Sequence, residues 1–180
     1  LQPVRGFSYA EHKARLDELL ARDVPQCVRL RPHVILGRHA QRLLQQLLRQ
    51  PCYLRLPEPY PRLQCVHEDD VAQAVVQSLV RDARGAYNLA APGDFSFRDV
   101  IRRSHRIGVA LPVPLARAAL SFAWRLTGWG GEPAWIDGLA ATLTLDCTRA
   151  RHDLGWQPVH DAAAMLFPGV RPSSPGTLQA

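Results

Sequence analysis

Two residues near the start of the chain, Tyr9 and Lys13, are the best suited to acid–base chemistry. Lys13 is the only lysine, although lysine and arginine together number 22. Residues four positions apart lie on one face of a helix. A free phenol has a pKa of about 10, and a nearby ammonium group stabilises the phenolate form. Such a pair can therefore give a proton to a substrate oxygen or take one from it.

The segment around this pair has the pattern of an amphipathic helix. Ser8 followed by Glu11 fits a capping box, and three leucines between positions 16 and 20 continue an apolar face. The pattern predicts a helix over about 9–22. A tyrosine and a lysine on a solvated helix face would show the same spacing, so this pair alone does not identify an enzyme.

Helices and strands are expected to alternate along the rest of the chain, which predicts an α/β layer structure. Between them, positions 51–61 contain four prolines and are expected to form a loop. His67, Asp69 and Asp70 fit a strand end followed by a helix capped by Asp69 or Asp70, with a catalytic or metal cluster as the alternative. Strands are expected at 27–30, 64–67 and 86–90. Further helices are expected at 40–49, from about 70 to Gly85, at 96–103 and at 115–127. The last helix is expected at 148–155.

Composition narrows the class of protein. The chain has 180 residues, 47% of them apolar, enough for a buried core. No apolar run reaches the roughly 18 residues of a membrane span, and the chain opens without the apolar segment of a secretory signal, so a cytoplasmic location is expected. The four cysteines form no CxxC pair and the histidines are scattered, which predicts free thiols and no metal site.

The formal net charge of +6 would permit binding to phosphates. The arginines are spread along the chain, whereas a nucleic-acid footprint usually gathers them on one stretch or face. A protein that does not bind nucleic acid is therefore expected. A steep salt dependence of binding to random DNA would support the opposite interpretation.

Five segments in order resemble the C-terminal half of an extended short-chain dehydrogenase/reductase, the group that contains NAD-dependent epimerases and dehydratases. Tyr9-x-x-x-Lys13 resembles that family's catalytic pair, and the other four segments resemble its later motifs. Those four are RPHVILG at 31–37, VHEDDVA at 66–72, GAYNL at 85–89 and LGWQP at 154–158.

The resemblance implies a partial Rossmann-type, doubly wound parallel sheet plus a small C-terminal α/β region that binds substrate. It implies that 1–38 end the dinucleotide-binding domain and that 39–167 form the substrate-binding part. A disordered tail is expected at 168–180. The family's Gly-rich pyrophosphate turn is absent from this sequence, so a fragment of a longer protein is expected.

The resemblance also implies roles for single residues. Tyr9 would be the acid/base in hydride transfer to or from NAD or NADP, and Lys13 its partner and a ligand of the nicotinamide ribose. Pro32, His33 and Val34 would lie beside the nicotinamide, although sugar-nucleotide epimerases commonly carry asparagine at the position of Val34. Arg62 and Gln64 would contact substrate.

The resemblance leaves the biological role open between two classes. The first is an NAD(P)-dependent oxidoreductase, epimerase or dehydratase acting on a nucleotide sugar or a sterol-like alcohol or ketone, inactive as this fragment alone. The second is a non-catalytic metabolite- or partner-binding module derived from the same fold. A homodimer is compatible with both.

Overall fold

The computed structural model describes residues 8–39, 52–54, 61–103, 107–109, 112–127 and 141–166. All strand pairs of these residues are parallel, and helices and strands are mixed along the chain, which confirms the predicted α/β class. The helix expected at 40–49 and the tail expected at 168–180 lie outside the described residues. In the described segments, no helix is long and apolar enough to cross a membrane.

The chain forms two compact units that interleave in sequence. The first contains Leu1–Asp23, Pro51–Arg62 and Ser96–Thr142, and the second contains Val24–Gln50, Leu63–Phe95 and Leu143–Ala180. The domain boundaries expected at 38 and 167 stay predictions.

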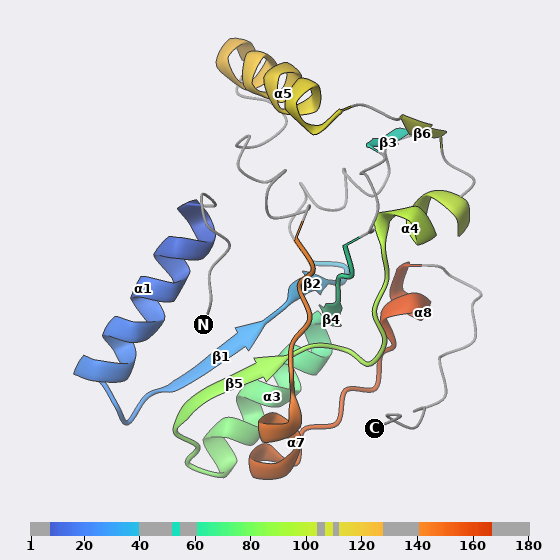
Figure 1. Cartoon of the computed structure of the whole chain (residues 1–180). Coiled ribbons are helices and arrows are strands. Elements are labelled where there is room, and N and C mark those ends of the chain that lie inside the picture. Colours follow the sequence, from blue (N-terminus) through green and yellow to red (C-terminus); the bar gives the residue numbers. More distant parts are fainter. Residues whose placement is uncertain are drawn as a thin grey trace. The chain divides into compact units, whose positions relative to one another are not determined.

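The second unit contains a parallel sheet in which one stretch of chain changes partner. The stretch consists of β1 (Val28–Pro32) and β2 (Val34–Leu36), separated only by His33. β1 pairs with β5 (Gly85–Leu89), beside which it lies in Figure 1, while β2 pairs with β4 (Cys65–His67). The backbone N–H of Ala91 donates to the Cys65 carbonyl at 2.7 Å, so β4 is bonded both to β2 and to the chain that leaves β5.

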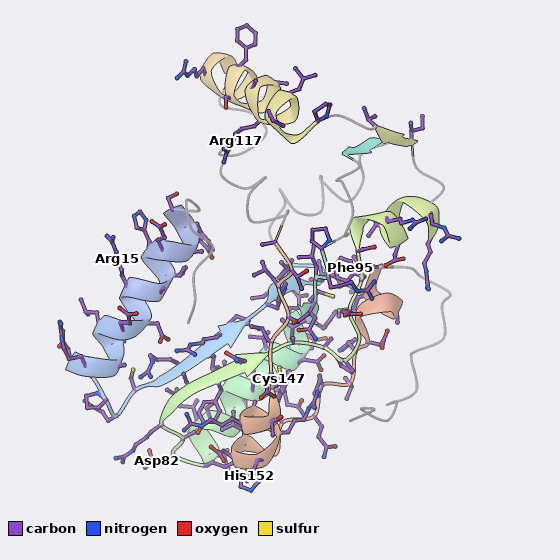
Figure 2. All side chains as sticks on the ribbon, in the orientation of Figure 1. Arg15, Asp82, Phe95, Arg117, Cys147 and His152 are labelled. Atoms are coloured by element: carbon purple, nitrogen blue, oxygen red, sulfur yellow. The ribbon has the colours of Figure 1, made fainter. Side chains whose placement is uncertain are left out.

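The core of this unit lies between the sheet and two helices, α3 (Glu68–Val80) and α7 (Thr148–Leu154). Strand residues alternate between the faces of a sheet, and Val28 and Leu30 of β1 pack against the buried cluster. Figure 2 shows the side chains filling this region, with Cys147 labelled just before α7. The cluster consists of Val66, Ala74, Tyr87, Leu89, Ala90, Cys147, Ala150, Leu154 and Trp156.

The ends of α3 differ from the sequence-based expectation. Its N-cap is His67, whose Nδ1 accepts a hydrogen bond from the backbone N–H of Asp69 at 3.2 Å. The prediction of Asp69 or Asp70 as the cap is wrong. Gly85 does not close the helix: it opens β5, and Asp82 supplies the left-handed residue of the preceding turn, with φ of 45°.

The end of α7 agrees with the sequence. Gly155 follows the helix in the left-handed conformation, with φ of 60°, a conformation that glycine adopts without steric cost. A further helix, α8 (Ala162–Leu166), comes after it, so α7 is not the last helix.

The described part of the first unit contains three helices and a short strand pair. The helices are α1 (Ser8–Asp23), α4 (Phe97–Arg103) and α5 (Val113–Thr127), close to their predicted ranges. β3 (Cys52–Leu54) pairs with β6 (Ile107–Val109), so the prediction of a loop throughout 51–61 is wrong. The start of α4 is a reciprocal cap, in which Ser96 N–H donates to Asp99 Oδ2 at 2.9 Å and Asp99 N–H donates to Ser96 Oγ at 3.2 Å.

Candidate active-site residues

The helix α1 places Tyr9 and Lys13 next to each other. The Lys13 Nζ lies 5.6 Å from the centroid of the Tyr9 ring, within the range of a cation–π contact. Tyr9 is 48% exposed and Lys13 is exposed, whereas Ala14 is the residue that this helix buries. The two side chains are therefore neighbours on the exposed part of α1.

His33 lies in the second unit, at the point where β1 passes into β2. Its Nδ1 accepts from the backbone N–H of Val34 at 2.7 Å, and its Nε2 lies 3.2 Å from the Leu143 carbonyl. A carbonyl only accepts, so the proton of the neutral ring is on Nε2, and both nitrogens are engaged within the fold. Burial lowers the pKa of His33, partly offset by the bond to Leu143. The side chain therefore links two segments of the unit.

The residues on either side of His33 are more exposed than His33 itself. Pro32 is exposed and Val34 is 41% exposed. Of the three residues predicted to lie beside the nicotinamide, these two keep an apolar surface open. A cofactor contact in this segment would come from them or from the backbone.

Arg62 and Gln64, the predicted substrate contacts, belong to different units. Arg62 Nη1 lies 3.3 Å from Asp99 Oδ2, which ties it to the start of α4. Burial raises the pKa of Asp99, but hydrogen bonds from Ser96 and the charge of Arg62 outweigh it and hold this pKa below its usual value. Gln64 Oε1 accepts from the backbone N–H of Leu145 at 2.7 Å, so its carbonyl is already used in the fold.

Sequence reasoning missed the junction centred on Asp70. This carboxylate is 1% exposed and accepts from the backbone N–H groups of Val159 at 3.0 Å and His160 at 3.3 Å. His160 Nδ1 lies 3.0 Å from Asp70 Oδ2, and Trp156 Nε1 donates to the Asp70 carbonyl at 2.8 Å. The VHEDDVA and LGWQP segments therefore contact each other in the fold. Their order in the sequence did not predict this contact.

A second contact forms at the same end of α3. The carboxylate of Glu68 accepts from the backbone N–H of His39, at 3.0 Å for Oε2. Gly37 has φ of 152°, and a Cβ built there would lie 2.3 Å from Glu68 Cδ. Glycine is favoured at this position because residues with a side chain rarely adopt this φ, and the Glu68 side chain would also have to move.

Cys27, Cys65 and Cys147 are free, as predicted. Burial raises the pKa of Cys65 to about 12, and the charge of Asp161 acts in the same direction. A thiol with this pKa stays protonated and unreactive at neutral pH. Cys65 is therefore a core residue and not a candidate nucleophile.

No protein-family model matches the chain. Among curated proteins, it is 29% identical over 164 residues to uncharacterised proteins of Mycobacterium bovis and Mycobacterium tuberculosis. The match covers 89% of this chain but only 18% of each relative. The chain therefore corresponds to a small part of these longer proteins.

Solved structures share the fold at low sequence identity. A UDP-glucose 4-epimerase from Stenotrophomonas maltophila with bound NAD has a TM-score of 0.59 and 18% identity, over 88% of this chain and 52% of that chain. A Helicobacter pylori ADP-L-glycero-D-manno-heptose-6-epimerase has a TM-score of 0.57 and 16% identity, over 88% and 48%. A human epimerase family protein with NADPH has a TM-score of 0.54 and 19% identity, over 77% and 46%. The chain thus shares the fold of about half of each of these proteins.

Proposed function

We propose that this chain is the C-terminal catalytic and substrate-binding part of an NAD(P)-dependent epimerase, dehydratase or oxidoreductase of the extended short-chain type. The observation that carries the proposal is the Tyr9–Lys13 pair, exposed on one face of α1 with Nζ 5.6 Å from the ring centroid. The fold shared with NAD- and NADPH-bound epimerases supports it. On this proposal, the chain supplies the acid/base of a longer enzyme.

In the proposed reaction, Tyr9 Oη takes the proton from a substrate hydroxyl group, or returns it to a carbonyl oxygen. The ammonium of Lys13 stabilises the negative charge that this transfer leaves on the phenol. A bound nicotinamide would supply the hydride acceptor or donor. Each residue by itself has a chemistry that suits that group: Pro32 and Val34 expose apolar surface in the second unit, and Lys13 exposes an ammonium donor in the first.

A nucleotide sugar is the substrate class we propose. The Stenotrophomonas epimerase structure holds a formylated UDP-arabinopyranose together with NAD. Arg62 can contribute a cation toward a diphosphate, and the amide nitrogen of Gln64 can contribute a donor. A sterol-like alcohol or ketone is the second substrate class, and a cytoplasmic location and a homodimer stay predictions.

Tyr9→Phe in the full-length protein that carries this chain tests the role of the phenol. The substitution removes the proton that is transferred and keeps the ring, so turnover of the UDP-sugar or alcohol substrate should fall by about 10²- to 10⁴-fold. Dinucleotide binding, followed by NADH fluorescence, and the melting temperature should stay unchanged. Turnover at the wild-type rate in this variant would contradict the assignment.

The role of Lys13 has a matched control on the same helix. Lys13→Met and Arg15→Met each remove one exposed cation from α1, on which Arg15 is labelled in Figure 2. Only Lys13→Met should reduce turnover. Equal losses in both variants would indicate a general effect of charge on this helix. A full-length protein with no affinity for NAD or NADP would favour the non-catalytic module.

A further inference from the structure

We propose that His67, Asp69 and His160 form a binding site for a borderline divalent metal ion such as Zn²⁺. The three residues each offer a donor atom, and these atoms lie within 4.8 Å of one another. Two imidazoles and a carboxylate are a common ligand set for zinc. The site lies within the second unit, between the start of α3 and the segment that follows α7, whereas Tyr9 and Lys13 belong to the first unit.

The hydrogen bonds of His160 leave its outer nitrogen ready to bind a metal. Its Nδ1 lies 3.0 Å from the buried carboxylate of Asp70, which can only accept. The proton of a neutral His160 is therefore on Nδ1, and Nε2 carries the lone pair. A carboxylate that holds the other nitrogen in this way is the usual support of a metal-binding histidine.

His67 and Asp69 are spaced as two ligands of one ion. The His67 Nδ1 carries the lone pair, which now accepts from the Asp69 backbone N–H, and it lies 3.4 Å from Asp69 Oδ2, so an ion bound there would replace this N-cap hydrogen bond. Two donors bound to one tetrahedral zinc at 2.0–2.2 Å are about 3.4 Å apart. The Asp69 side chain is 76% exposed, so it can adjust its position without disturbing the core.

Metal binding would compete with the present stacking of the two rings. The centroids of His67 and His160 are 3.8 Å apart, and the ring planes differ by 19°. To reach a tetrahedral edge of about 3.4 Å, donors up to 4.8 Å apart must converge by roughly 1.4 Å. A small rotation of the partly exposed His160 ring and of the Asp69 carboxylate would provide this.

The surrounding charge favours a cation. The first turn of α3 carries Glu68, Asp69 and Asp70, which more than offset the positive end of the helix dipole. A bound ion would join the start of α3 to the segment that Asp70 already holds. We therefore expect the ion to stabilise the fold and to take no part in the reaction at Tyr9.

The test is a titration of the metal-free full-length protein with ZnCl₂, by calorimetry, and with CoCl₂, by visible absorption. Binding of one equivalent in the micromolar range or tighter is expected, with the absorption of a tetrahedral Co²⁺ complex. Saturating Zn²⁺ should raise the melting temperature by about 5 °C. A protein that binds no equivalent of either ion would overturn the proposal.

Three variants assign the ligands while keeping the structure. His67→Asn retains an N-cap acceptor, His160→Asn retains a donor toward Asp70, and Asp69→Asn changes an exposed side chain. Each should weaken Zn²⁺ binding at least tenfold. His152→Asn is the control, because His152 is an exposed histidine paired with Asp153 outside this group. Unchanged affinity in Asp69→Asn and His160→Asn, or an equal loss in His152→Asn, would show that these residues do not form the site.

Discussion

The Tyr9–Lys13 face of α1 and the Asp70 junction of α3 both come from motifs of the same family resemblance, but they are built in opposite ways. Tyr9 is 48% exposed, and its neighbour Lys13 is supplied by the next turn of the same helix. Asp70 is 1% exposed, and its partners lie 86 to 90 residues away in the chain.

On the proposed function, this difference separates a pair that is available for chemistry from a residue that holds the fold together. A side chain that meets a substrate must stay open to solvent, and little of the fold depends on it. A buried carboxylate with several donors pointing at it is the opposite case, because any change leaves those donors unsatisfied. Motif resemblance alone gives the two groups equal weight, and burial and bonding tell them apart.

Asp70→Asn should give the largest loss of stability. The substitution replaces one carboxylate oxygen by an amide group, which cannot accept from the Val159 or His160 donors that face it. The free energy of unfolding should fall by about 3 kcal/mol, or roughly 8 °C in melting temperature. Chemical denaturation measures this fall in the free energy of unfolding. A loss below about 1 kcal/mol would remove the contrast between the two regions.

Gly37→Ala should give the next largest loss. The new methyl group would meet Glu68 and would require φ of 152° at a residue with a Cβ, at a cost of about 2 kcal/mol. Combining it with Glu68→Ala sharpens the test. Glu68→Ala should recover the part of the free-energy cost that comes from the steric contact. The part that comes from the backbone conformation of residue 37 should remain.

The free energy of unfolding should depend on pH through His33. Its pKa is lowered in the folded state, so the unfolded chain binds a proton first as the pH falls. The stability that the neutral ring contributes is complete above about pH 6.5 and is lost as the pH falls from there toward the folded pKa. His33→Gln should flatten the stability profile across this window, measured by denaturation at pH 5 to 8. An identical profile in the variant would contradict this role.

Lys13→Met should have the smallest effect on stability, within about 0.5 kcal/mol. An exposed ammonium near an aromatic ring contributes little to folding. The same variant should lose turnover, as proposed above. A stability loss comparable to that of Asp70→Asn would show that Lys13 serves the fold and would place both motifs in one class.

The sequence predicted the elements that local patterns determine. The period of the leucines gave α1, and Gly155 marked the end of α7, because helix periodicity and a left-handed glycine are properties of a few consecutive residues. The sequence also placed the catalytic candidates together, since their proximity needs only one helical turn.

What it missed depends on residues far apart. β3 lies among prolines and forms a strand only through pairing with β6, more than 50 positions later. The cap of α3 is a histidine, which is uncommon at such positions, and Asp70 is buried because the segment at 156–160 covers it. The contact of His33 Nε2 with the Leu143 carbonyl joins residues 110 positions apart, and the predicted role of His33 beside a nicotinamide stays a prediction.

The single exposed lysine also makes this chain unusually simple to address with amine-directed reagents. An acylating probe has one side chain to react with, Lys13, beside the ring of Tyr9. A mass shift within the peptide that contains Lys13 would therefore report the accessibility of the proposed active centre. Its suppression by a dinucleotide, in the intact protein, would report cofactor occupancy at this one residue, without any substitution and without a substrate.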